Sequence, residues 1–372
     1  MNKSCIFGTM NEQLKYQIAL TLVPGVGDVL GKKLVAYCGG AEAVFLEKKS
    51  SLEKIPGIGS KVVANILKQQ VLSRAEEEIA FIEKQDIQPF FYLDKAYPKR
   101  LQQCADGPIM LYYKGNVDLN HERVIGVVGT RNATTYGKQV CEQIAEQLSD
   151  DKILVVSGLA YGIDSFAHRA ALKSGLPTVG VLAHGLDRLY PAQNKQLADK
   201  MLENGGLLTE FLTKTNPDRE NFPRRNRIVA GMIDALIVVE SASRGGALIT
   251  AEIANSYNRD VFAIPGKVGD TYSEGCNYLI RTNRAHLMEK ADHLRYIMRW
   301  DDKPKAIQMQ IFRNFTEEET LIMHVFGDET ICSIDEMIVK TNLTTTKIAS
   351  ILLSLEFDGV LLALPGKRYQ KL

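Results

Sequence analysis

The sequence predicts an α/β protein built on a doubly wound, mainly parallel sheet. Between Val124 and Met288, short apolar runs recur and helical patterns fill the intervals between them. The runs are apolar at consecutive positions, which is typical of strands buried on both faces. Several runs end at a glycine-containing turn, as at Gly129 and Gly158, where a parallel strand passes into a helix.

The central strands are expected at residues 124–128, 153–156, 178–182, 207–208, 235–239, 261–264 and 286–288. Short strands at 87–92 and 109–115 are expected to lead into them. Ligands bind beyond the carboxyl ends of parallel strands, where free helix amides also attract phosphate. The residues that follow each run are therefore the first candidates for a site.

An internal repeat marks the N-terminal part. Val23-Pro24-Gly25-Val26-Gly27 and Ile55-Pro56-Gly57-Ile58-Gly59 share one pattern, and a helical pattern follows each. Glycine turns before bare helix amides are typical of helix-hairpin-helix phosphate contacts. A small helical domain that uses the hairpins only for packing fits equally well, so both interpretations stay open.

The C-terminal part predicts a winged helix after a linker at 301–304. Acidic residues 317–319 start one helix, patterns at 333–339 and 344–357 supply two more, and residues 360–369 form a hairpin. Residues 301–372 hold 8 Lys+Arg against 11 Asp+Glu, a net charge of −3. With this charge, contact with a protein or weak contact with duplex DNA is at least as well supported as sequence-specific DNA binding. The hypothesis that the protein is purely a transcription regulator is therefore the least favoured. The expected domains are 1–85, 86–300 and 301–372.

Composition narrows the class of protein. The net charge of +1 means that any nucleic-acid binding must come from local clusters of basic residues. The six cysteines and six histidines are scattered, so we expect no disulfide framework, no metal site and no cofactor, and most cysteines are expected to be small buried residues. Without a long apolar run or a leader peptide, a soluble cytoplasmic protein with no membrane contact is expected.

Arginines concentrate before the run at 235–239. Arg219, Arg224, Arg225 and Arg227 fall within nine residues, with Asn226 between the last two. Arginine at this density suits bidentate phosphate binding, and Arg131 adds another charge after the first central run. The alternative is an exposed loop whose arginines pair with Asp218 and Glu220. Asn226 favours a binding role for the cluster, because it can donate to a phosphate or a base edge.

The sequence offers no catalytic constellation. Asp164 is interpreted as a helix N-cap and His168 as a packing or capping residue. For His184 a structural role is favoured, and contact with a ligand is the alternative. The sequence shows no positioned acid, base and nucleophile, no phosphate-binding lysine loop and no metal cluster. We therefore expect a binding protein and no enzyme.

These motifs together resemble the bacterial DNA-processing protein A family (DprA, also called Smf). The order and spacing hold across about 160 residues. The matching stretches are Val128-Gly129-Thr130-Arg131, residues 157–164 with 167–169, 185–187 with 190–191 and 194–195, 222–223 with 225–228, 248–251, and 264–266 with 274–277.

The resemblance implies an extended Rossmann-like sheet that binds single-stranded DNA without sequence preference and protects it. It also implies loading of the RecA recombinase during natural transformation, and a homodimer. Carried over by motif, the strand-binding residues would be Gly129, Thr130, Arg131, Ser157, Gly158, Gly162, Lys195, Arg219, Arg225, Asn226, Arg227 and Gly246. Phe222 or Tyr161 could stack on bases, and the alternative is that both belong to the core.

Two departures from the family pattern stand out. Gly245-Gly246-Ala247 lacks a serine hydroxyl that the family commonly has, and Asn283-Arg284 replaces a usual Gly-Ala. We expect Asn283 to keep the left-handed turn, because asparagine tolerates that backbone. As an alternative function, residues 244–252 resemble the loop of nucleoside-monophosphate phosphoribohydrolases, in which Arg131 and Glu252 would flank a ribose phosphate.

Overall fold

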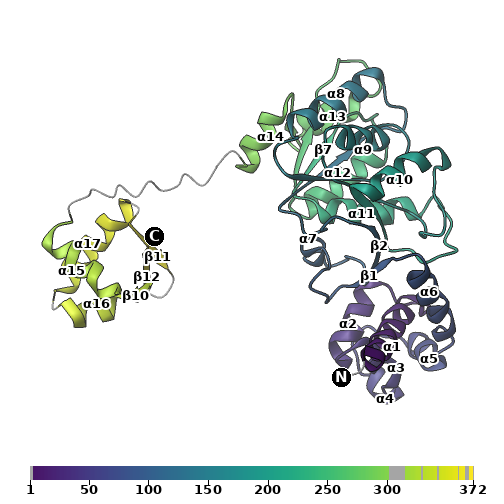
Figure 1. Cartoon of the computed structure of the whole chain (residues 1–372), viewed down its shortest axis with the longest axis horizontal. Coiled ribbons are helices and arrows are strands. Elements are labelled where there is room, and N and C mark those ends of the chain that lie inside the picture. Colours follow the sequence, from purple (N-terminus) through teal and green to yellow (C-terminus); the bar gives the residue numbers. More distant parts are fainter. Residues whose placement is uncertain are drawn as a thin grey trace. The chain divides into compact units, whose positions relative to one another are not determined.

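The computed structural model describes residues 3–300, 315–327, 330–341, 343–358, 360–364 and 368–371. The chain divides into two compact units, Met1–Met298 and Arg299–Leu372 (Figure 1). The linker expected at 301–304 and the turn at 365–367 lie outside the described residues. The further division of the first unit near residue 85 stays a prediction.

A nine-stranded sheet forms the centre of the first unit, with the order β1-β2-β6-β5-β4-β3-β7-β8-β9. Strands β3 to β9 pair in parallel, and β1 and β2 join the β6 edge antiparallel. This confirms the predicted sheet and every predicted strand within a few residues. The strands are β1 Gln88–Phe91, β2 Met110–Gly115, β3 Arg123–Val128, β4 Ile153–Ser157, β5 Thr178–Val181, β6 Gly205–Thr209, β7 Ala235–Val238, β8 Asp260–Ala263 and β9 His286–Leu287.

Helices cover both faces of this sheet because successive strand residues point to opposite sides. Val124 and Leu154 pack in one core with residues of α11 and α12. Ile125 and Val155 instead lie against residues of α8 and α9. The helices of this part are α7 Lys99–Gln102, α8 Thr135–Gln147, α9 Ile163–Lys173, the 3-10 turn η1 Ala192–Asn194, α10 Lys195–Glu203, α11 Asn221–Met232, α12 Gly246–Ser256, α13 Glu274–Arg281 and α14 Ala291–Met298.

The strand order reverses between β3 and β7. From β3 the chain builds outward through β4, β5 and β6, and then returns to add β7, β8 and β9 on the other side. The loops after β3 and β7 therefore diverge and leave a crevice at the carboxyl ends of the strands. Past α13, Asn283 has a φ of +54°, which confirms the left-handed turn expected there.

Six helices precede the sheet. Gly25 and Gly57 have φ values of +88° and +82°, as the two hairpins require. The hairpins hold each other, since Lys33 donates to the Pro56 carbonyl and Asn65 Nδ2 donates to the Pro24 carbonyl at 3.0 Å. These helices share an apolar core with residues of β1 and β2. They are α1 Lys3–Leu22, α2 Asp28–Cys38, α3 Ala41–Leu46, α4 Lys49–Leu52, α5 Ser60–Lys68 and α6 Leu72–Lys84.

The second unit contains the three predicted helices and the terminal hairpin, with one extra strand, β10, that was not predicted. Thr316 and Glu319 form a reciprocal capping box at the start of the first helix. Its strands pair antiparallel in the order β10-β12-β11. The elements are α15 Glu317–Phe326, β10 Ile331–Ser333, α16 Ile334–Thr341, α17 Thr345–Phe357, β11 Leu361–Leu364 and β12 Arg368–Lys371. Among the described helices of the whole chain, none is both long and apolar enough to cross a membrane.

Candidate functional site

A pocket of about 240 Å³ opens at the point where the strand order reverses. The loops after β3, β4 and β7 form three of its walls, and one face of α11 forms the fourth. Its lining residues are Val128, Gly129, Thr130, Arg131, Gly158, Ala160, Asp164, Phe222, Arg225, Asn226, Val229, Ser241, Ala242, Arg244, Gly245, Gly246, Ala247 and Thr250. Seven of the twelve residues predicted from the sequence are therefore brought together here.

The remaining five predicted residues do not line this pocket. Ser157 is buried behind it and donates to the Val127 carbonyl. Gly162 has a φ of +75° and lies against the Thr130 and Arg131 backbone, where a Cβ would clash. Lys195 and Arg219 are exposed on neighbouring segments. Arg227, the fifth, points to a different part of the molecule.

Arg131 is the exposed cation at the pocket mouth. Its guanidinium carbon lies 4.8 Å from the centre of the Phe222 ring, a cation–π arrangement that orients the side chain. Phe222 in turn meets Tyr190 edge-to-face, with ring centres 6.2 Å apart. Arg131 is near enough to the buried Asp164 to counteract the rise in pKa that burial causes in that carboxyl, but within the described part of the chain no carboxylate forms an ion pair with it. Its charge is therefore available to a bound anion.

Arg225 supplies a second, buried guanidinium to the same pocket. The residue is 4% exposed, and its Nη1 donates to the Val181 carbonyl at 2.9 Å. The guanidinium lies directly over Gly158, where no side chain would fit. Burial lowers the pKa of Arg225, and the nearby Asp164 carboxylate opposes this shift. The Nε of Arg225 is buried without a partner in the described part of the chain, so its bonding capacity is not exhausted.

Asp164 is not the N-cap that the sequence suggested. Gly162 occupies the N-cap position of α9, and Asp164 lies in the first turn, where its Oδ2 accepts from the Ala160 amide at 3.3 Å. Burial raises the pKa of Asp164, while Arg225 counteracts the shift. The amino ends of α9 and α12 both point toward the pocket region, because Ala160 and Gly245 line it just ahead of the two helices. Free backbone amides there favour an anion.

Three of the four clustered arginines lie on a helix and not in an exposed charged loop, whereas Arg219 lies in the exposed segment just before that helix. Arg224, Arg225, Asn226 and Arg227 all belong to α11, so successive side chains leave it about 100° apart. Arg224 and Arg227 both pair with Glu210, and neither pairs with Asp218 or Glu220 as the loop alternative required. Arg227 is thus engaged in an ion pair and does not line the pocket.

Arg244 and Phe222 line the pocket but were not among the twelve predicted strand-binding residues, although Phe222 was considered for base stacking. Arg244 is exposed in the loop after β7 and lines the pocket opposite Arg131's loop. Phe222 lines both this pocket and an adjoining hollow formed with Tyr161, Tyr190 and other residues. Arg244 follows a parallel strand, so the rule that ligands bind beyond strand carboxyl ends was sufficient to find it.

The geometry does not support the alternative phosphoribohydrolase function. That function needs Glu252 beside Arg131, but Glu252 is exposed on α12, does not line the pocket, and pairs with Arg284 at 3.2 Å. His168 is fully buried against Thr178, and burial lowers its pKa to about 3. His184 is buried between the Gly185 carbonyl and the Tyr190 amide, and it also lines the hollow that adjoins the pocket.

The five cysteines whose side chains the structure describes are free thiols. Cys104, Cys141, Cys276 and Cys332 are buried and Cys38 is half-buried, which confirms the expectation that most are small packed residues. The side chain of Cys5 lies outside the described residues.

Comparison with known proteins gives a consistent result. The family described as DNA recombination-mediator protein A matches residues 88–298, and the DprA winged helix domain matches residues 316–367. Protein Smf of Synechocystis sp. is 30% identical over 97% of this chain and 99% of its own length. DNA processing protein DprA of Streptococcus pneumoniae is 42% identical over 54% of this chain and 70% of its own.

Solved structures agree with the sequences. The X-ray structure of DNA processing protein A from Streptococcus pneumoniae superposes with a TM-score of 0.65 at 34% identity, covering 76% of this chain and 97% of that one. That of DNA processing protein A from Helicobacter pylori, described for its single-stranded DNA binding mode, gives 0.53 at 26% identity, covering 58% and 96%. The pocket at the reversal of strand order, the matched domains and these relatives lead to one conclusion: the chain belongs to the DNA recombination-mediator protein A family.

Proposed function

We propose that this chain binds single-stranded DNA in the pocket at the strand reversal, without preference for base sequence. The observation that carries the proposal is the combination of Arg131, exposed and lying over the Phe222 ring, with the buried Arg225 on the pocket floor. Cationic groups beside an aromatic face suit the alternating phosphates and bases of a single strand. The backbone amides at the amino ends of the helices also bind anions, and this binding does not depend on the identity of the base.

The same pocket supports binding without catalysis. Asp164 is the single carboxylate among the lining residues, and it already accepts a backbone hydrogen bond. A general acid, a general base and a nucleophile within reach of one another are what an enzymatic step requires, and the lining residues do not supply that set. We therefore propose a DNA-handling role that protects the strand.

The resemblance extends the proposal to loading of the RecA recombinase on incoming DNA during natural transformation, by a homodimer. Support comes from relatives that carry the name DNA processing protein DprA and from the Helicobacter pylori protein that binds single-stranded DNA. Purified chain should accelerate assembly of RecA filaments on a strand coated with single-strand-binding protein. If filament assembly is unaffected while DNA binding is intact, the recombinase part of the proposal fails alone.

Anisotropy titration with labelled oligothymidine tests the binding itself. We expect tighter binding to single strands than to duplex, and a fall of affinity with salt whose slope counts the phosphates contacted, about 0.7 for each. Arg131→Ala should cost about 1–3 kcal/mol, because charge-assisted hydrogen bonds are lost. Arg281→Ala is the matched control, since it removes an exposed arginine from α13 that lines neither hollow. Equal affinity for both DNA forms, or equal losses in the two variants, contradicts the proposal.

A further inference from the structure

Arg227 connects the pocket helix α11 to the N-terminal helices. Its Nη2 lies 2.5 Å from Glu210 Oε2, just past β6, and 3.1 Å from Asp28 Oδ2, the first residue of α2. Its Nη1 donates to the Asp106 carbonyl in the loop before β2. One guanidinium therefore joins three segments far apart in the sequence: α2, the loop before β2 and the segment after β6.

This junction is buried, so its partners are difficult to replace with water. The side chains of Arg227 and Glu210 are only 11% and 5% exposed. Burial raises the pKa of Glu210 to about 7, and Arg227 counteracts the shift. Glu210 and Asp28 each place a carboxylate oxygen against the Arg227 guanidinium, so both contribute to balancing its charge. Removing one partner of a buried pair leaves an uncompensated charge, which is strongly unfavourable.

Asp28 holds α2 in place at the same time. Its Oδ1 accepts from the Ile109 amide at 3.0 Å, while its Oδ2 faces Arg227. Gly31, one turn later, packs so closely on Ile109 that it has no room for a Cβ. The amino end of α2 is therefore docked on the sheet. The Asp28 carboxylate that makes this docking contact also fixes the position of the Arg227 guanidinium.

The link to the pocket runs through the rigid body of α11. Arg225 and Asn226 immediately precede Arg227 on that helix, and both line the pocket. Arg225 is held over Gly158, and Asn226 Nδ2 donates to the Gly246 carbonyl at 3.4 Å. A shift of α11 after loss of the Arg227 contact would displace both pocket residues together.

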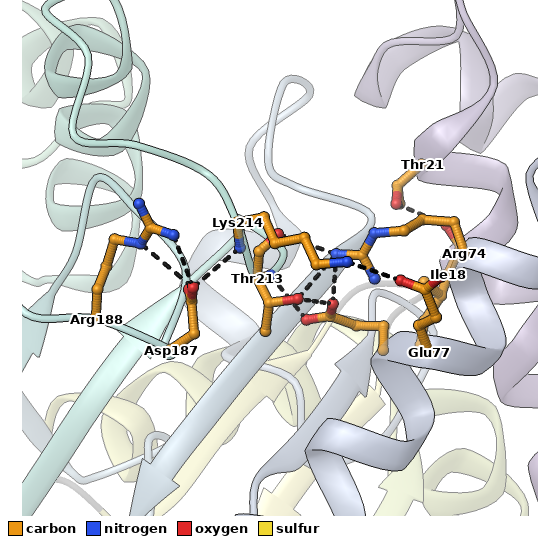
Figure 2. Close-up of polar contacts among 9 residues, drawn as sticks. Ile18, Thr21, Arg74, Glu77, Asp187, Arg188, Thr213 and Lys214 are labelled. Carbon is orange, nitrogen blue, oxygen red and sulfur yellow. Dashed lines mark hydrogen bonds and ion pairs between the residues drawn. The ribbon is translucent and has the colours of Figure 1, made fainter.

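A second polar contact between the N-terminal helices and the sheet provides the comparison. Figure 2 shows Arg74 of α6 reaching Thr213, with Glu77 beside Lys214 and with Asp187 between Arg188 and Lys214. Glu78 is buried at its centre, where it accepts from Thr213 and pairs with Arg74 at 2.8 Å. None of these residues belongs to α11.

We propose that Arg227 is a positioning residue for strand binding, and that Asp28 of α2 controls it, so the docking of the N-terminal helices sets the affinity of the pocket. The inference rests on the proposed function of that pocket. A ligand or protein that displaces α2 would thereby weaken DNA binding without touching the DNA site.

The test compares Asp28→Asn with Glu78→Gln in the full chain. Each removes one carboxylate charge from a contact between the N-terminal helices and the sheet, but only the first contact reaches α11. We expect Asp28→Asn to weaken oligothymidine binding about threefold to tenfold, as for residues that act through another group. Glu78→Gln should lower stability and leave affinity within about twofold when measured well below its unfolding temperature. Asp28→Glu, which keeps the charge, should restore most of the affinity.

Hydrogen exchange supplies a readout that needs no DNA. In Asp28→Asn, amides of α11 should exchange faster while those of α8 are unchanged. Unchanged affinity and unchanged α11 exchange in Asp28→Asn overturn the inference, and so do equal affinity losses in Asp28→Asn and Glu78→Gln. If Arg131→Ala weakens binding but Asp28→Asn does not, only the positioning role falls. If the unmodified chain fails to bind oligothymidine, the proposed function and the inference fall together.

Discussion

Gly158→Ala is a sensitive test of the pocket, because it adds one methyl group beneath the buried Arg225. An added Cβ would approach three guanidinium atoms, Nη1, Cζ and Nη2, to less than 3.0 Å. Real Cβ atoms do not make such contacts, so the guanidinium must move. It would then lose the 2.9 Å hydrogen bond from Nη1 to the Val181 carbonyl.

The size of the effect follows from these contacts. A hydrogen bond from a charged group contributes about 1.5–3 kcal/mol, and overpacking a buried site costs about 1–3 kcal/mol. Because one movement of Arg225 produces both costs, they overlap, and we expect a loss of about 2–3 kcal/mol in the free energy of unfolding. Oligothymidine binding should weaken as well, since Arg225 leaves the pocket floor.

The control is Gly245→Ala in the same pocket. Gly245 has extended backbone, with φ 164° and ψ 172°, and nothing lies within 4 Å of the Cβ position. Urea unfolding, followed by circular dichroism, measures stability, and anisotropy titration measures DNA affinity. In urea unfolding, Gly245→Ala should be close to the unmodified chain. A Gly158→Ala protein with unaltered stability and affinity would refute the placement of Arg225 over Gly158.

Three further predictions follow from single contacts. Burial depresses the pKa of His168 from 6.5 to about 3, so its stabilising contribution is present above pH 6.5 and is lost as pH falls toward 3. From about pH 7.5 to pH 5 the unmodified chain should lose about 2 kcal/mol more than His168→Gln in urea unfolding, and equal losses would contradict the assignment. Arg244→Ala should weaken oligothymidine binding and reduce the salt slope by about 0.7, and an unchanged slope would exclude Arg244 from phosphate contact. Thr316→Ala removes the cap of α15 and should destabilise the second unit by about 1 kcal/mol in thermal unfolding, whereas Thr346→Ala, which removes an exposed threonine of α17, should leave that cap unchanged.

Much of the architecture was determined by local sequence alone. Apolar runs long enough only for strands, separated by helical patterns, permit few arrangements other than a parallel sheet covered on both faces. Gly25 and Gly57 have the left-handed backbone conformation that their hairpins require, and Asn283 has it as well. These features depend on residues close together in the chain, which is why the sequence predicted them.

The location of the pocket could also be predicted, because parallel strands bring their carboxyl ends to one edge. Gly129, Arg131 and Gly158 follow such strands and do line the pocket. Which crevice along that edge is the open one was not predicted. The strand order decides it, and that order depends on pairings between distant segments.

The roles of neighbouring arginines were decided by tertiary structure alone. Arg224, Arg225 and Arg227 look equivalent in the sequence, but the helix directs Arg225 to one side and Arg224 and Arg227 to another, where both meet Glu210. Arg225 is buried over Gly158 and lines the pocket, whereas Arg227 meets Glu210 and Asp28, which come from segments 17 and 199 residues away. The sequence determined that positive charge gathers here; only the fold determined which charge is free to bind a ligand, because the compensating carboxylates come from other parts of the chain.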